Sequence, residues 1–96
     1  MAANGTSAIR VSIHGRVQGV WYRGWTVENA AALGLSGWVR NRGDGTVEAL
    51  FAGSSDAVET MIARCHDGPP AAHVIAVERF PATTPAEPGF NQLPTV

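Results

Sequence analysis

The chain has 96 residues, a net charge of −1 and a hydrophobic share of 45%. This length accommodates one domain, and the near-neutral charge argues against a general nucleic-acid-binding protein. The sequence has no apolar run long enough to cross a membrane and no basic and apolar leader typical of a signal peptide. Its single cysteine excludes a disulfide framework and fits a reducing compartment, so we expect a cytoplasmic protein.

The first part of the chain predicts a strand, a turn and a helix. Residues 8–15 alternate apolar and polar side chains, which is typical of a strand with one buried face. Residues 15–20 contain two glycines and predict a turn. From Tyr22 to Leu33 apolar residues recur at helical spacing, and Gly34 is placed to end that helix.

The middle of the chain predicts a β-hairpin. Residues 36–41 and 46–53 are strand-like, and the Asp44-Gly45 pair between them is a strong hairpin signal. Alternation along the second strand places three side chains in the core: Val47, Ala49 and Phe51.

The last part of the chain predicts a second helix and two further strands. Ser54 or Ser55 can cap the helix. Its apolar residues have the spacing of one buried face: Val58, Met61, Ile62 and Cys65. Residues 72–80 are typical of a fourth strand, and residues 89–96 predict a weaker fifth strand.

This order of elements, β-α-β-β-α-β with one more strand, predicts an α+β domain. It is typical of the ferredoxin-like (split β-α-β) sandwich, an antiparallel sheet with two helices on one face. Residues 1–7 are expected to be a flexible lead, and residues 8–96 to form the single domain. Many activities share this fold, so function must be inferred from a site.

An RNA-recognition module shares the same element order and is one alternative. Such modules stack bases on aromatic side chains of their two central strands. The solvent-side positions of the corresponding strands here carry no aromatic residue: Arg10, Ser12, His14, Glu48 and Leu50. Together with the negative net charge, this argues against nucleic acid as a partner.

Charge is distributed unevenly along the chain. Residues 1–43 contain five arginines and one acidic residue, whereas residues 44–96 contain two arginines and seven acidic residues. Such polarity can concentrate an anion near the first half, although a short chain can also be uneven by chance. All seven basic residues are arginine, the side chain best suited to two-pronged contact with phosphate or carboxylate.

The segment GRVQGVWYR, residues 15–23, suggests where an anion would bind. A glycine-bracketed turn between a strand and a helix exposes consecutive backbone N–H groups at the helix amino terminus. Arg23 lies in the first helical turn, from where its guanidinium can reach the same anion. The alternative is an ordinary turn beside a surface arginine. A P-loop requires a lysine, which the chain lacks, and the spacing does not fit a dinucleotide-binding fingerprint.

Two longer motifs together resemble the acylphosphatase family. They are GRVQGVWYR at 15–23 and GLSGWVRNRGDGTVE at 34–48, and both match in order and spacing. The resemblance covers residues 8–81 and extends to the Gly-Phe pair of the last strand. It implies hydrolysis of the carboxyl–phosphate anhydride of acyl phosphates to carboxylate and inorganic phosphate, by in-line attack of water and with no metal or other cofactor.

The resemblance also implies the roles of particular residues. Arg23 would bind the phosphate through two hydrogen bonds, and Asn41 would hold the attacking water. The backbone amides that would cradle the phosphate belong to Arg16, Val17, Gln18, Gly19 and Val20. The expected substrate is a small acyl phosphate, with inorganic phosphate or sulfate as competing anions. We expect a monomer with no nucleic-acid or membrane partner. No metal ligands are expected, and the three histidines lack ligand spacing.

A nearer alternative is an acylphosphatase-like domain that handles carbamoyl phosphate for a larger maturation enzyme; the length of the chain argues against it. The chain also departs from the family pattern around the arginine. Tyr22 replaces a common Phe and adds a hydroxyl that needs a partner. Gly24 weakens the helix start, and Trp21 can line the mouth of the site. Arg40 and Arg42 should lie on the face opposite Asn41, in solvent.

Overall fold

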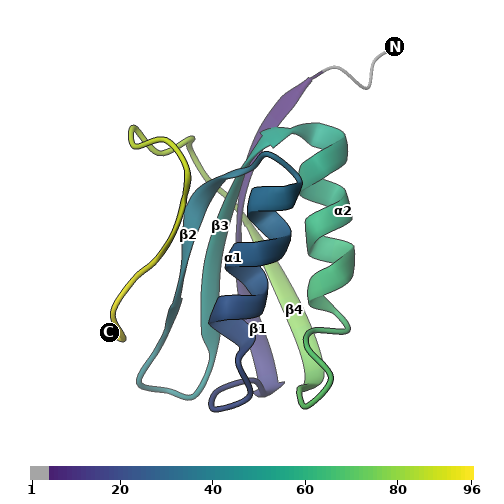
Figure 1. Cartoon of the computed structure of the whole chain (residues 1–96), viewed down its shortest axis with the longest axis vertical. Helices are drawn as coiled ribbons and strands as arrows, with labels where there is room; N and C mark the ends of the chain where they lie inside the picture. The colour runs from purple at the N-terminus through teal and green to yellow at the C-terminus, as the bar shows by residue number, and fades with distance from the viewer. Residues whose placement is uncertain (1–4) are drawn as a thin grey trace.

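The computed structural model describes residues 5–96, which form five strands and two helices. In chain order these are β1 (Thr6–Arg16), α1 (Tyr22–Ala32), β2 (Ser36–Asn41), β3 (Val47–Ser54), α2 (Ser55–Cys65), β4 (His73–Pro81) and β5 (Phe90–Gln92). Figure 1 labels both helices and the strands β1 to β4. Of the expected lead over residues 1–7, the first four lie outside the described residues. Strand β1 already includes Thr6 and Ser7, which pair with Ser54 and Gly53 of β3.

The strands form one sheet in the order β4-β1-β3-β2-β5, and both helices cover the same face (Figure 1). This confirms the ferredoxin-like fold. The predicted antiparallel pairing is correct for β1 to β4, whereas β5 pairs in parallel with β2. The difference arises because the chain crosses from one sheet edge to the other after β4 and turns back. Strand β5 then runs opposite to β4 and in the same direction as β2.

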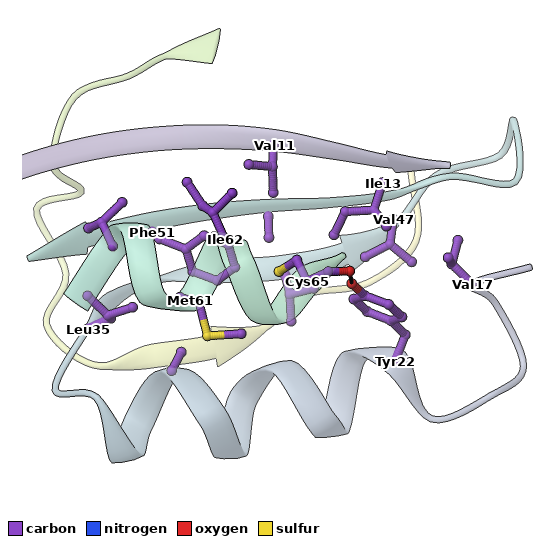
Figure 2. Packing of buried hydrophobic residues seen from close by; sticks show 14 residues of the cluster. Val11, Ile13, Val17, Tyr22, Leu35, Val47, Phe51, Met61, Ile62 and Cys65 are labelled. Atoms are coloured by element: carbon purple, nitrogen blue, oxygen red, sulfur yellow. Dashed lines mark hydrogen bonds between the residues drawn. The ribbon is translucent and has the colours of Figure 1, made fainter. Parts of the chain in front are cut away.

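The core fills the space between the sheet and the two helices (Figure 2). The predicted inward residues of β3 (Val47, Ala49 and Phe51) and of α2 (Val58, Met61, Ile62 and Cys65) are all buried. Two β1 residues, Val11 and Ile13, pack against them. Alternation along strands and helical periodicity therefore identified the core correctly.

The ends of the elements follow from local chemistry. Gly34 follows α1 with a φ of 73°, a conformation that favours glycine, as predicted for a helix end. The side chain of Ser54 caps α2 by accepting a hydrogen bond from the backbone N–H of Ala57 at 3.2 Å. The hairpin between β2 and β3 turns at Gly45, whose φ is 95°, and Asp44 accepts hydrogen bonds from the N–H and hydroxyl of Thr46.

The face of the sheet away from the helices carries a cluster of charged residues around one buried carboxylate. Glu48 of β3 is only 4% exposed. Its carboxylate pairs with three arginines, Arg10 (3.2 Å), Arg40 (2.8 Å) and Arg42 (3.2 Å). Burial acts to raise the pKa of Glu48, but the hydrogen bonds and charges of Arg40 and Arg42 outweigh it and lower the pKa.

Two predictions about this face are settled by these contacts. Arg40 and Arg42 do lie opposite Asn41, with side chains 27% and 43% exposed, and both also pair with Glu48, a contact that the sequence did not predict. The central strands lack aromatic residues on this face, as predicted. Strands β2 and β4, which flank the central pair, supply Trp38, which stacks under Arg40, and Phe80, which stacks under Arg10.

Candidate active site

Residues from both sequence motifs meet in one cavity at the amino end of α1. The cavity has a volume of about 160 Å³. It is lined by Val17, Gly19, Trp21, Tyr22, Arg23, Gly24, Asn41 and Gln92. The structure therefore brings together the loop after β1, the first turn of α1 and the end of β2. It also adds Gln92 of β5, which no sequence motif indicated.

The loop between β1 and α1 is shaped by two glycines and anchored by one buried side chain. At its start Gly15 has a φ of 124°, and a Cβ at this position would overlap the carbonyl oxygen of His73 on β4. At its centre Val17 is buried in the core, and Gly19 turns the chain with a φ of 75°. The glycines predicted to shape this turn therefore do so, and one of them also permits close strand pairing.

This loop presents free backbone donors. Within residues 5–96, the N–H groups of residues 17–20 make no hydrogen bond to another protein group. Because they precede the amino terminus of α1, they add to the positive end of the helix dipole. The arrangement can therefore bind an anion without help from a lysine.

The side chain of Gln18 attaches the loop to the β2–β3 hairpin. Its Nε2 donates hydrogen bonds to the carbonyl oxygens of Arg42 at 2.8 Å and Thr46 at 2.9 Å. Sequence reasoning considered only the backbone amide of Gln18 and missed this contact. The hydrogen bonds fix the loop relative to the strand end that carries Asn41.

Tyr22 anchors the start of α1 to the end of α2. Its hydroxyl donates a 2.6 Å hydrogen bond to the carbonyl oxygen of Cys65 (Figure 2). That oxygen lacks the usual helical donor four residues on because position 69 is proline. The predicted need of the Tyr22 hydroxyl for a partner is thus met. Burial, followed by the influence of Cys65 and Asp67, raises the pKa of Tyr22 far above its ordinary value. Tyr22 is therefore a neutral structural residue.

Arg23 is available for a ligand. Five of the seven arginines contact a side-chain oxygen: Arg10, Arg40, Arg42, Arg64 and Arg79. In the described part of the chain, neither Arg16 nor Arg23 makes such a contact. These two arginines flank the loop, so uncompensated positive charge is concentrated beside its free N–H groups.

Asn41 ends β2 with its side-chain amide also available. Its backbone oxygen accepts a 3.1 Å hydrogen bond from Val96, which ties the strand end to the last residue of the chain. Among residues 5–96, its side-chain amide has no hydrogen-bond partner. The amide can therefore donate to or accept from a small molecule in the cavity.

The residues that line the cavity include no carboxylate, histidine or cysteine. His14 lies on the opposite face of the sheet, with its Nε2 3.0 Å from Glu78 Oε1 and 3.3 Å from Ser12 Oγ. Cys65 is buried in the core, as predicted, and burial raises the pKa of its thiol to about 12. Across residues 5–96 no cluster of three or more His, Cys, Asp or Glu could hold a metal ion. No helix in the same range is long and apolar enough to span a membrane.

Comparison with known proteins identifies the family. The acylphosphatase family model matches residues 9–92. An acylphosphatase of Rhodospirillum rubrum is 59% identical over 86 residues, which are 90% of this chain and 94% of the relative. One of Rhizorhabdus wittichii is 55% identical over 89 residues, covering 93% of this chain and 90% of the relative.

A solved acylphosphatase structure from Coxiella burnetii has the same fold. It superposes with a TM-score of 0.88 at 29% identity, covering 97% of this chain and 100% of that chain. The resemblance of the two motifs is thereby confirmed. The chain belongs to the acylphosphatase family and is an enzyme that hydrolyses acyl phosphates.

Proposed function

We propose that the cavity at the amino end of α1 is the active site. In this proposal the backbone N–H groups of Arg16, Val17, Gln18, Gly19 and Val20 and the guanidinium of Arg23 hold the phosphate, and Asn41 holds the attacking water. The observation that carries the proposal is that Arg23 and Asn41, from separate motifs, line one cavity together with the loop.

Binding of the phosphate relies on donors that are already in place. The N–H groups of residues 17–20 and the guanidinium of Arg23 have no competing protein acceptor among residues 5–96. A phosphate dianion can therefore bind without breaking an internal hydrogen bond, and Arg23 can contact two of its oxygens. Inorganic phosphate and sulfate, which present the same oxygens, should compete with substrate.

The chemical step transfers the phosphoryl group to water. The water oxygen bonds to phosphorus while the bond from phosphorus to the bridging oxygen breaks, and the electron pair leaves on the carboxylate. Asn41 orients the water but cannot take its proton, so the proton passes to an oxygen of the phosphoryl group. Because a carboxylate is a weak base, it leaves without a general acid, which agrees with the residues that line the cavity.

No step in this scheme requires a metal ion. Phosphoryl transfer depends on positioning and on stabilisation of charge on the equatorial oxygens. The loop N–H groups, the helix dipole and Arg23 supply both at the same point. We therefore infer that the enzyme works with no cofactor. We also propose that the enzyme acts as a monomer. A cytoplasmic location fits its single buried thiol.

Hydrolysis of benzoyl phosphate in the presence of a metal chelator tests the proposed site. Wild-type protein should retain full activity with the chelator, and inorganic phosphate should inhibit competitively. Arg23→Ala should lose activity and phosphate inhibition, whereas Arg64→Ala, which removes an arginine from α2, should retain both. Activity that disappears with the chelator and returns with added metal would contradict the metal-free mechanism. Full activity of Arg23→Ala would show that the active site lies elsewhere.

A further inference from the structure

Trp21 presents the largest exposed apolar surface in the cavity. Trp21 is the N-cap residue between the loop and α1, and it is 57% exposed. The other large apolar lining residues, Val17 and Tyr22, are 1% and 2% exposed and face the core. A ligand that extends beyond the polar part of the cavity would therefore meet the indole of Trp21.

The backbone of Trp21 is held in an uncommon conformation. Its φ is 68° and its ψ is 24°, and it is the one residue other than glycine with positive φ within residues 5–96. Bulky side chains rarely adopt this left-handed region. Such strain persists where surrounding contacts enforce it and is concentrated at functional sites. Here it fixes the direction in which the indole leaves the loop.

Gly24 makes room for the indole. A Cβ at position 24 would overlap Nε1 of Trp21, so the ring packs directly on the backbone of the first turn of α1. Gly24 itself lines the cavity. The two departures from the family pattern at this point are thus one feature: a tryptophan two residues before Arg23 and a glycine that lets its ring approach the helix backbone.

The chemistry of the substrate assigns a role to this feature. An acyl phosphate has an anionic half, which the loop and Arg23 are proposed to bind, and an acyl half, which is apolar beyond its carbonyl group. We propose that Trp21 binds the acyl half, packs best on aromatic acyl groups and so gives the enzyme a preference for aromatic acyl phosphates. Gly24 is the positioning residue for the ring. This inference rests on the proposed location of the active site.

The proposed binding of the acyl half by Trp21 can be tested by comparing two substrates. The quantity to measure is the ratio of kcat/KM for benzoyl phosphate to kcat/KM for acetyl phosphate. Trp21→Ala should lower this ratio about tenfold, the effect of losing one aromatic pair, mainly through KM for benzoyl phosphate. Trp21→Phe, which keeps an aromatic ring, should retain most of the wild-type ratio. Gly24→Ala should lower the ratio too, because the methyl group displaces the indole while improving the helix. Trp38→Ala, which removes an indole from the opposite face of the sheet, should leave the ratio unchanged.

A binding measurement separates substrate recognition from catalysis. Phenacylphosphonate and acetonylphosphonate replace the bridging oxygen by a methylene group, so they resist hydrolysis. Trp21→Ala should weaken inhibition by phenacylphosphonate about tenfold more than inhibition by acetonylphosphonate. If the kcat/KM ratio and the inhibition ratio of Trp21→Ala both stayed within about twofold of wild type, the inference would be overturned. A lower thermal unfolding temperature in that variant would then show that Trp21 contributes to stability only. Activity that is unaffected by Arg23→Ala would instead overturn the proposed site.

Discussion

Gln18, in the loop before α1, is hydrogen-bonded to Arg42, the residue after Asn41, through a 2.8 Å contact between its Nε2 and the Arg42 carbonyl oxygen. A second hydrogen bond, 2.9 Å to the carbonyl oxygen of Thr46, completes the attachment. The proposed phosphate loop and the proposed water-holding residue lie on separate segments of the chain. Gln18 therefore sets their separation, although its side chain does not line the cavity.

Replacement of Gln18 by Ala should reduce turnover without removing the phosphate site. The backbone N–H of residue 18 remains, but the loop can move relative to Asn41. We expect kcat for benzoyl phosphate to fall at least about tenfold, because small displacements of reacting groups are costly. The free energy of unfolding should fall by about 1 kcal/mol for each lost hydrogen bond. Gln18→Glu, which cannot donate and adds negative charge, should be worse. A kcat equal to wild type in both variants would contradict a positioning role.

Replacement of Arg23 by Lys should fail although the positive charge is kept. A lysine ammonium is a point charge and cannot reproduce the two-pronged contact of a guanidinium with phosphate. We expect kcat/KM for benzoyl phosphate to fall more than tenfold, about 1.4 kcal/mol in transition-state stabilisation. Arg64→Lys, on the surface of α2, is the matched control and should behave as wild type. Activity of Arg23→Lys within tenfold of wild type would show that charge alone suffices.

Replacement of Tyr22 by Phe should destabilise the protein measurably. It removes the 2.6 Å hydrogen bond to Cys65 and leaves a buried carbonyl oxygen for which Pro69 supplies no N–H donor. We expect the free energy of unfolding in urea, followed by circular dichroism, to fall by about 2 kcal/mol. A loss below about 0.5 kcal/mol would be typical of a surface substitution and would show that this contact contributes little.

Replacement of Glu48 by Gln should change how stability depends on pH. The pKa of Glu48 is lowered from 4.5 in the folded protein, so its carboxylate stabilises the fold above that value. The contribution is lost as pH falls from 4.5 through the lowered pKa. The free energy of unfolding should therefore fall less in Glu48→Gln than in wild type between about pH 6 and about pH 3. Parallel pH profiles would contradict a stabilising carboxylate at this position.

Local sequence patterns were sufficient to predict most of the fold. Alternation identified Val47, Ala49 and Phe51 as core residues, and helical spacing identified the buried face of α2. Gly34 and Ser54 marked ends of helices because their preferences are local. The direction of β5 was not predicted correctly. It depends on the path of the chain across the sheet after β4, and no local sequence pattern specifies that path.

Residues of the candidate site could be proposed from the sequence where they belong to a local motif. Contacts between segments that are distant in the chain could not be predicted in this way. The motifs proposed Arg23 and Asn41 as site residues, and the structure places both in one cavity. The attachment of Gln18 to Arg42 and the partner of the Tyr22 hydroxyl depend on tertiary packing. The same holds for Glu48, whose contact with Arg10 spans 38 positions in the chain. The pairing of Arg40 and Arg42 with that carboxylate was therefore not predicted.

The central claim is that Arg23 binds phosphate while Asn41 acts on water. Asn41 lies on a different element from the loop and brings no charge. Asn41→Ala should therefore leave the Kd for inorganic phosphate nearly unchanged while kcat falls about a hundredfold, on the order of 3 kcal/mol. Arg23→Ala should impair both quantities, because the guanidinium contacts phosphate before and during the reaction.

The decisive measurement is the phosphate Kd of Asn41→Ala by titration calorimetry, made beside its kcat on benzoyl phosphate, with circular dichroism confirming an intact fold. Our account predicts phosphate binding within about twofold of wild type together with the hundredfold loss of kcat. Loss of phosphate binding in folded Asn41→Ala would make Asn41 a phosphate ligand and contradict the proposed division of roles.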